Sequence, residues 1–112
     1  MYAFYLERHG FYVAVAADGE AGIRTAQSEP FDVIVMDLSM PRMDGVEATK
    51  QLKADARTRE VPIIVVTGHA LRGKAQEAVV AGARSYCVKP CLPEQLHEEI
   101  ERALADGTPP DR

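Results

Sequence analysis

The sequence has no long apolar run, no basic run and no evident leader. No stretch approaches the ~20 apolar residues that a membrane span needs, so neither a membrane segment nor a membrane partner is expected. The net charge of -4, with no cluster of Lys and Arg, argues against direct binding to nucleic acid. The first residues show neither a basic start nor a small-residue cleavage site. We therefore expect a cytoplasmic protein.

Cysteine and histidine are scarce; the two cysteines lie close together in the sequence, and the three histidines are scattered. The two cysteines are Cys87 and Cys91, and without a secretion signal we expect free thiols rather than a disulfide scaffold. Cys87 is expected to pack as a small hydrophobic residue. The histidines His9, His69 and His97 have no metal-ligand spacing with the cysteines, so no zinc site is expected.

The composition is that of one globular domain. The 112 residues are 46% hydrophobic, which is adequate for a core, and contain neither a repeat nor a low-complexity block. Residues 1–105 are predicted to form the domain. Residues 106–112 are rich in glycine and proline and are expected to be a flexible tail.

Helical and strand patterns alternate along the chain. Residues 33–36 form a continuous apolar run, which is typical of a strand buried on both faces of a parallel sheet. Turn signals such as Asp18-Gly19 separate the elements, and Asp18 could cap the helix that follows it. The alternation predicts an α/β fold, a doubly wound parallel sheet with helices on both faces. Strands are expected at 11–16, 31–37, 61–67 and 85–89, and helices at 1–9, 20–28, 46–54, 71–81 and 93–105.

Three consecutive predicted strands end in Asp37, Thr67 and Lys89. The carboxyl ends of parallel strands share one edge of the sheet, so these side chains can meet in one crevice. A carboxylate can accept a phosphoryl group, a hydroxyl can donate to it, and an ammonium group can offset its charge. Each residue also has an ordinary explanation: Asp37 as the start of a turn, Thr67 as a strand former, and Lys89 as a solvated charge.

Several ordered motifs together resemble the receiver domain of bacterial two-component response regulators. The resemblance covers residues 1 to about 105 and implies a flavodoxin-like receiver fold. The family's usual turn falls at Ala17-Asp18-Gly19. The motifs that carry the resemblance are Asp37-Leu38-Ser39-Met40-Pro41-Arg42-Met43-Asp44-Gly45, Val65-Val66-Thr67-Gly68, Ala81-Gly82-Ala83 and Val88-Lys89-Pro90.

The resemblance implies that Asp37 accepts a phosphoryl group from a sensor histidine kinase. Mg²⁺ would then be held by Asp37 and the backbone carbonyl of Ser39. Thr67 and Tyr86 match the family's switch pair, and Lys89 matches its phosphate-contacting lysine. The Lys89-Pro90 bond matches one that is typically cis in this family. The resemblance implies a signalling module rather than an enzyme.

The output surface is expected on helix 71–81, strand 85–89 and helix 93–105, where a downstream protein target would bind. Tyr86 lies in the middle of this surface, and Thr67 would connect it to the phosphate. Tyr86 could equally be a half-buried aromatic residue with a solvated hydroxyl.

The sequence departs from the family at its start. The family has a first, central strand, which lies between its second and third strands and ends in an acidic pair that helps to hold Mg²⁺. The predicted second and third strands here are 11–16 and 31–37, and both the central strand and the acidic pair are missing. We interpret Met1 as an internal methionine, expect weak Mg²⁺ binding, and expect self-association through unpaired strands.

Two other functions fit parts of the pattern. The first is a receiver-like interaction module that is never phosphorylated because its metal site is incomplete. The second is a phosphatase of the haloacid-dehalogenase type, which would use Asp37 as nucleophile. Such enzymes place a second Asp two residues later as general acid, and Ser39 stands there instead.

Overall fold

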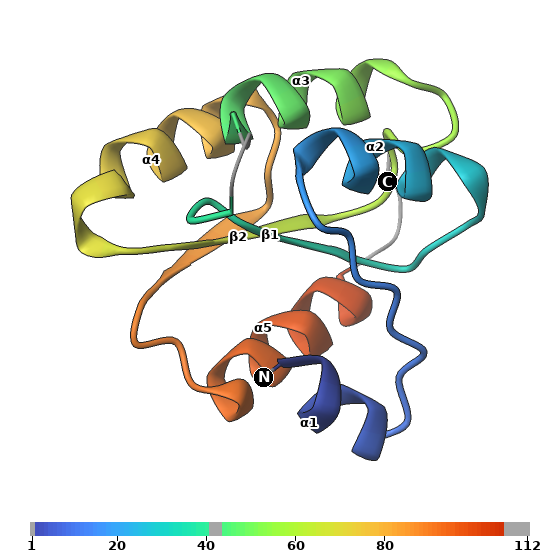
Figure 1. Ribbon diagram of the computed structural model, residues 1–112, viewed down its shortest axis with the longest axis vertical. Helices are drawn as coiled ribbons and strands as arrows, with labels where there is room; N and C mark the ends of the chain where they lie inside the picture. The colour runs from blue at the N-terminus through green and yellow to red at the C-terminus, as the bar shows by residue number, and fades with distance from the viewer. Residues whose placement is uncertain (1, 41–43, 107–112) are drawn as a thin grey trace.

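Three parallel strands form the centre of the computed structural model, which describes residues 2–40 and 44–106 (Figure 1). They are β1 (Ile34–Asp37), β2 (Ile63–Thr67) and β3 (Ser85–Val88), in the order β1-β2-β3. The parallel direction predicted for these strands is confirmed.

Helices cover both faces of this sheet. Figure 1 shows α2 (Gly19–Ser28), α3 (Gly45–Ala54) and α4 (Arg72–Ala81) on one face. The opposite face carries α1 (Tyr2–Arg8) and α5 (Pro93–Ala105). The doubly wound α/β architecture predicted from the alternating pattern is therefore confirmed.

Strand β2 is the most deeply buried element because it has a strand on each side and helices on both faces. Its five residues are all buried. Ile63 and Val65 pack into the cluster beneath α3 and α4, whereas Ile64 and Val66 pack into the cluster beneath α1 and α5. This alternation explains why the predicted strand reads as an unbroken apolar run.

Short polar side chains set where two helices begin. The Asp18 carboxylate caps α2 by accepting a hydrogen bond from the Ala21 N–H at 2.9 Å, as predicted. Asp44 caps α3 in the same way, accepting from the Glu47 N–H at 3.1 Å. Each cap satisfies an amide that has no partner within its helix.

The prediction of a strand at residues 11–16 is wrong. The segment has no regular structure, although Phe11 and Val13 still pack against the core while Tyr12 and Val15 remain exposed. A strand forms only where a neighbour pairs with its backbone, and no strand among the described residues lies beside this segment. A cavity of about 370 Å³, lined mainly by apolar side chains, separates it from β1 instead.

Other differences concern the ends of elements. The second strand of the sheet begins at Ile63 because Pro62 has no N–H to donate to a ladder. The helix predicted at 71–81 begins at Arg72, after a short 3₁₀ turn, His69–Leu71. Asp106 follows α5, and the rest of the predicted tail, 107–112, lies outside the described residues, as do Met1 and residues 41–43. None of the helices among residues 2–40 and 44–106 has the length and apolar character to cross a bilayer.

Candidate functional site

The carboxyl ends of the strands bring Asp37 and Lys89 together, as the sequence predicts. Asp37 is the last residue of β1, and Lys89 directly follows β3 on the far side of β2. The Lys89 Nζ lies 3.1 Å from Asp37 Oδ2 and forms an ion pair with it. Because the Lys89 N–H donates to the Thr67 carbonyl at 2.7 Å, the backbone of β2 also fixes the position of the lysine.

Ser39 links the carboxylate to the lysine. Its backbone N–H and its hydroxyl both donate to Asp37 Oδ1, at 2.9 and 2.7 Å. The hydroxyl oxygen also accepts a hydrogen bond from the Lys89 Nζ at 3.1 Å. Ser39 therefore holds Oδ1 of Asp37, and Lys89 holds Oδ2.

These contacts determine the charge of Asp37. Partial burial by itself would raise the pKa of this carboxyl group, but the hydrogen bonds from Ser39 and the nearby charge of Lys89 outweigh it and hold the pKa below its ordinary value. The side chain of Asp37 is 28% exposed, so it remains in contact with solvent. Asp37 is thus an accessible, ionised carboxylate at neutral pH.

Neither Thr67 nor Tyr86 forms a hydrogen bond to Asp37 among the contacts that the structure describes. The fully buried Thr67 donates its hydroxyl hydrogen to the Gly68 carbonyl at 3.0 Å. Tyr86 packs against the core cluster on the α3 and α4 side, and its hydroxyl accepts from Gln76 Nε2 at 3.3 Å. In this structure the two predicted switch residues have other partners.

The donor set around Asp37 is small for a metal ion. Among residues 2–40 and 44–106, no three His, Cys, Asp or Glu side chains lie close enough together to hold one. Mg²⁺ commonly binds through one or two carboxylates, keeps several waters and takes phosphate oxygens as further ligands. Asp37 and the Ser39 carbonyl fit that kind of site, but not a cage built by the protein alone.

The sequence reasoning missed two contributors to this region. The Ser39 hydroxyl was not predicted to act, although an Asp side chain often accepts a hydrogen bond from the backbone two residues later, which brings that residue beside the carboxylate. Tyr2 lies near Asp37 and Lys89, and its hydroxyl donates to the Cys91 carbonyl at 2.6 Å. Burial raises the pKa of Tyr2, with opposing influences from Lys89 and Asp37. No pattern in the sequence pointed to Tyr2.

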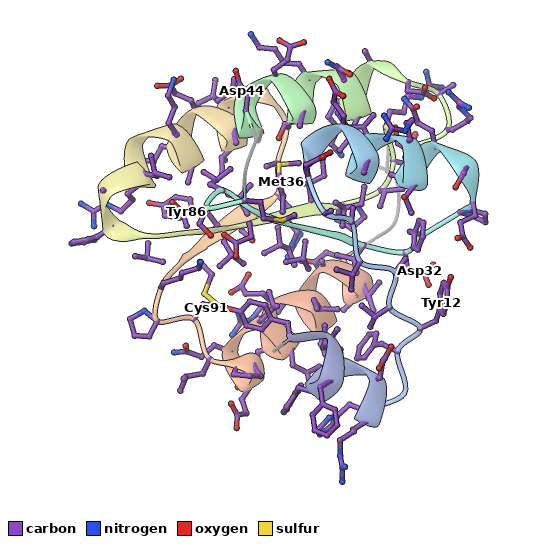
Figure 2. All side chains as sticks on the ribbon, in the orientation of Figure 1. Tyr12, Asp32, Met36, Asp44, Tyr86 and Cys91 are labelled. Atoms are coloured by element: carbon purple, nitrogen blue, oxygen red, sulfur yellow. A yellow bond between two sulfur atoms is a disulfide. The ribbon has the colours of Figure 1, made fainter. Side chains whose placement is uncertain are left out.

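The expectation of two free thiols is wrong in this structure, where Cys87 and Cys91 form a disulfide. The turn after β3 brings their Cα atoms to 6.0 Å, within the range that a disulfide spans. Spacing in the sequence alone could not show this turn. Between the two cysteines, the Lys89-Pro90 bond is cis, as the resemblance implied. Figure 2 shows Cys91 on the α5 side of the sheet, opposite Met36.

Comparison with known proteins identifies the family. The model of the response regulator receiver domain matches residues 1–101. The chain is 39% identical over 100 residues to protein PilH of Pseudomonas aeruginosa, an alignment that covers 89% of this chain and 83% of PilH. It is also 35% identical over 91 residues to the histidine-protein kinase BarA of Shigella flexneri, covering 81% of this chain but only 10% of that kinase.

A solved structure shows the same fold. The receiver domain of a sensor histidine kinase from Pseudomonas aeruginosa superposes with a TM-score of 0.79 at 34% identity, covering 89% of this chain and 82% of that one. That protein was crystallised with a magnesium ion coordinated in its active-site cleft. The chain therefore belongs to the response regulator receiver domain family and is a module of two-component phosphorelay signalling.

Proposed function

We propose that Asp37 accepts a phosphoryl group from a phosphohistidine on a sensor histidine kinase. The observation that supports this most strongly is the ionised carboxylate of Asp37, held at the carboxyl edge of the sheet by Ser39 and Lys89. An accessible carboxylate beside a fixed ammonium group is suited to attack on phosphorus. A cytoplasmic location follows from the same proposal, because kinases draw their phosphate from cytoplasmic ATP.

The transfer has a simple balance of bonds. A carboxylate oxygen of Asp37 attacks the phosphorus of the phosphohistidine, the P–N bond breaks, and the histidine leaves with its electron pair and takes a proton. The product is an acyl phosphate on Asp37. Lys89 already contacts Asp37 Oδ2, so its ammonium group is in reach of the new phosphoryl oxygens and offsets their charge.

We propose that Mg²⁺ assists weakly. Asp37 and the Ser39 carbonyl are the residues that would hold it, and the ion would neutralise part of the phosphoryl charge. The Lys89 ammonium lies 3.1 Å from the Asp37 carboxylate, and the described residues offer no group of three ligating side chains, so the free protein offers little attraction for a divalent cation. Binding would therefore depend on the phosphoryl group as a further ligand.

The proposed output surface lies on α4, β3 and α5. Thr67 would exchange its bond to the Gly68 carbonyl for one to a phosphoryl oxygen, and Tyr86 would leave Gln76. Such a pair of alternative contacts is an element that a new charge can bias. Large apolar side chains exposed on or beside these elements support docking of a downstream protein; they are Leu71, Val80, Leu92 and Leu104.

The test compares two carboxylates. We expect acetyl phosphate with Mg²⁺ to add a phosphoryl group to the wild-type protein slowly, and not to add one to Asp37→Asn. The matched control is Asp44→Asn, which keeps a good cap for α3 because asparagine accepts the same hydrogen bond. Labelling that persists in Asp37→Asn, or that disappears in Asp44→Asn, would contradict the proposal.

A second candidate, the unphosphorylated interaction module, is favoured by one observation: among the described residues, no three His, Cys, Asp or Glu side chains lie close enough together to hold a metal ion. Beryllium fluoride, which mimics a phosphoryl group on a carboxylate, separates the two functions. Binding that requires Mg²⁺ and Asp37 supports the acceptor, whereas a complete lack of binding supports the interaction module. A hydrolase is not supported, since Ser39, the nearest hydroxyl to Asp37, has no titratable proton at neutral pH.

A further inference from the structure

The Cys87–Cys91 disulfide encloses the lysine of the phospho-acceptor site. Cys87 lies in β3 and Cys91 lies two residues beyond Lys89, so the bridge closes a loop with a sequence separation of only four. Within that loop, Lys89 is held by the Thr67 carbonyl at its backbone and by Asp37 and Ser39 at its ammonium group. The bridge and the site therefore share one short segment of chain.

The two sulfur atoms differ in their surroundings. Cys91 is only 3% exposed and belongs to the core cluster beneath α1 and α5, where its carbonyl accepts the Tyr2 hydroxyl hydrogen. Cys87 is half-buried and only partly covered by the same cluster. A small thiol from solvent thus has better access to the Cys87 sulfur than to the Cys91 sulfur.

A disulfide that closes so short a loop restricts little of the unfolded chain, since the entropic effect of a bridge grows with the length of the loop. Its main effect is local, on the residues between the two cysteines. Those residues include Lys89 but none of the other side chains that contact Asp37.

We propose that Cys87 and Cys91 form a reversible redox site, which a small dithiol or thiol reduces and whose state controls how firmly Lys89 is held at Asp37. This goes beyond the proposed function, and neither the redox chemistry nor its effect on Lys89 requires Asp37 to be phosphorylated.

The chemistry is thiol–disulfide exchange. An external thiolate attacks the accessible Cys87 Sγ, the bond between the two protein sulfurs breaks, and Cys91 leaves as a thiolate that takes a proton. A second external thiolate then attacks the mixed disulfide and releases Cys87. Two external thiols are oxidised to one disulfide, and the protein disulfide gains two electrons and two protons.

Reduction frees the loop at its two ends. Lys89 then keeps its own hydrogen bonds but loses the covalent constraint that limits motion of the flanking residues. We expect the Lys89 N–H, which donates to Thr67, to exchange with solvent faster in the reduced protein. The amides of the buried strand β2, such as Val65, should not change.

The experiment equilibrates the full chain with mixtures of reduced and oxidised dithiothreitol and alkylates any free thiols. Peptide masses then give the bridged fraction, and hydrogen exchange followed by NMR gives the rate at Lys89. We expect Cys87 and Cys91 to become alkylated together in one two-electron transition, accompanied by faster exchange at Lys89. In Cys87→Ser, exchange at Lys89 should equal that of the reduced wild type and should not respond to dithiothreitol.

Two results would overturn the proposal. One is that the cysteines remain free thiols at every ratio of the two forms of dithiothreitol. The other is that the bridge forms but exchange at Lys89 is the same in the oxidised and reduced proteins. Cys87→Ser is preferred to Cys91→Ser because Cys87 is the less buried of the two, and the wild-type comparison decides the matter even if a variant folds poorly.

Discussion

The open edge of β1 predicts self-association through strand pairing. Among the described residues, β1 pairs only with β2. The Ile34 N–H donates to the carbonyl of Pro62, just before β2, and the Leu38 N–H donates to the carbonyl of Val66 within β2, each at 2.9 Å. Because amides alternate in direction along a strand, those of Val33, Val35 and Asp37 point away from β2, towards the cavity. These groups form a template on which another strand can pair.

Val35→Pro tests this edge. Proline removes one donor that faces away from β2 and leaves the ladder between β1 and β2 intact. A strand hydrogen bond contributes a net ~0.5–1.5 kcal/mol, and a symmetric dimer loses two of them, so association should weaken by about 1–3 kcal/mol, or about 5- to 150-fold. Val35→Thr, which has nearly the same shape and keeps the N–H, should associate more tightly than Val35→Pro.

Sedimentation velocity over a series of protein concentrations measures this association directly. We expect the wild type to shift from smaller to larger species as concentration rises, and to unfold at a temperature that depends on concentration. A monomer at every concentration, with a sharp, reversible and concentration-independent unfolding transition, would show that the edge of β1 does not pair with a second chain.

Three further predictions follow from single contacts. Because the pKa of Asp37 is lower in the folded protein, its carboxylate stabilises the fold at pH values above the ordinary carboxyl pKa of 3.8. That contribution to the free energy of unfolding should disappear as the pH falls through the pKa of the folded state. Urea unfolding should therefore show the wild type losing any stability advantage over Asp37→Asn in acid. Leu52→Ala should cost about 2–5 kcal/mol in the free energy of unfolding, because Leu52 is only 2% exposed in the cluster beneath α3. Asp44→Ala should cost about 1 kcal/mol through loss of the α3 cap, while Asp44→Asn should cost almost nothing. A cost for Asp44→Asn equal to that of Asp44→Ala would show that the cap does not act through its hydrogen bond.

The sequence was most informative where burial and polarity change sharply. The apolar runs before Asp37 and Thr67 identified strands, and parallel strands meet at one edge, so the proximity of Asp37 to Lys89 followed without knowledge of distances. The Asp18 cap was readable for a similar reason, since it depends only on residues that are close in sequence.

Features that depend on distant or absent neighbours could not be read in this way. Residues 11–16 have the side chains of a strand, but a strand also needs a backbone partner, and the described residues offer none. The Cys87–Cys91 bridge depends on the path of a single turn, which spacing does not specify. Tyr2 reaches the Cys91 carbonyl only because α1 packs beside α5.

Chemical trapping of the acyl phosphate tests the central proposal most directly. Borohydride reduces an aspartyl phosphate to homoserine, so the modified position is recorded as a permanent change in side-chain mass. After treatment with acetyl phosphate, Mg²⁺ and borohydride, we expect fragment-ion mass spectrometry to find homoserine at position 37. Homoserine at Asp18, Asp44 or another carboxylate, with Asp37 unchanged, would contradict the assignment of Asp37 as the phospho-acceptor.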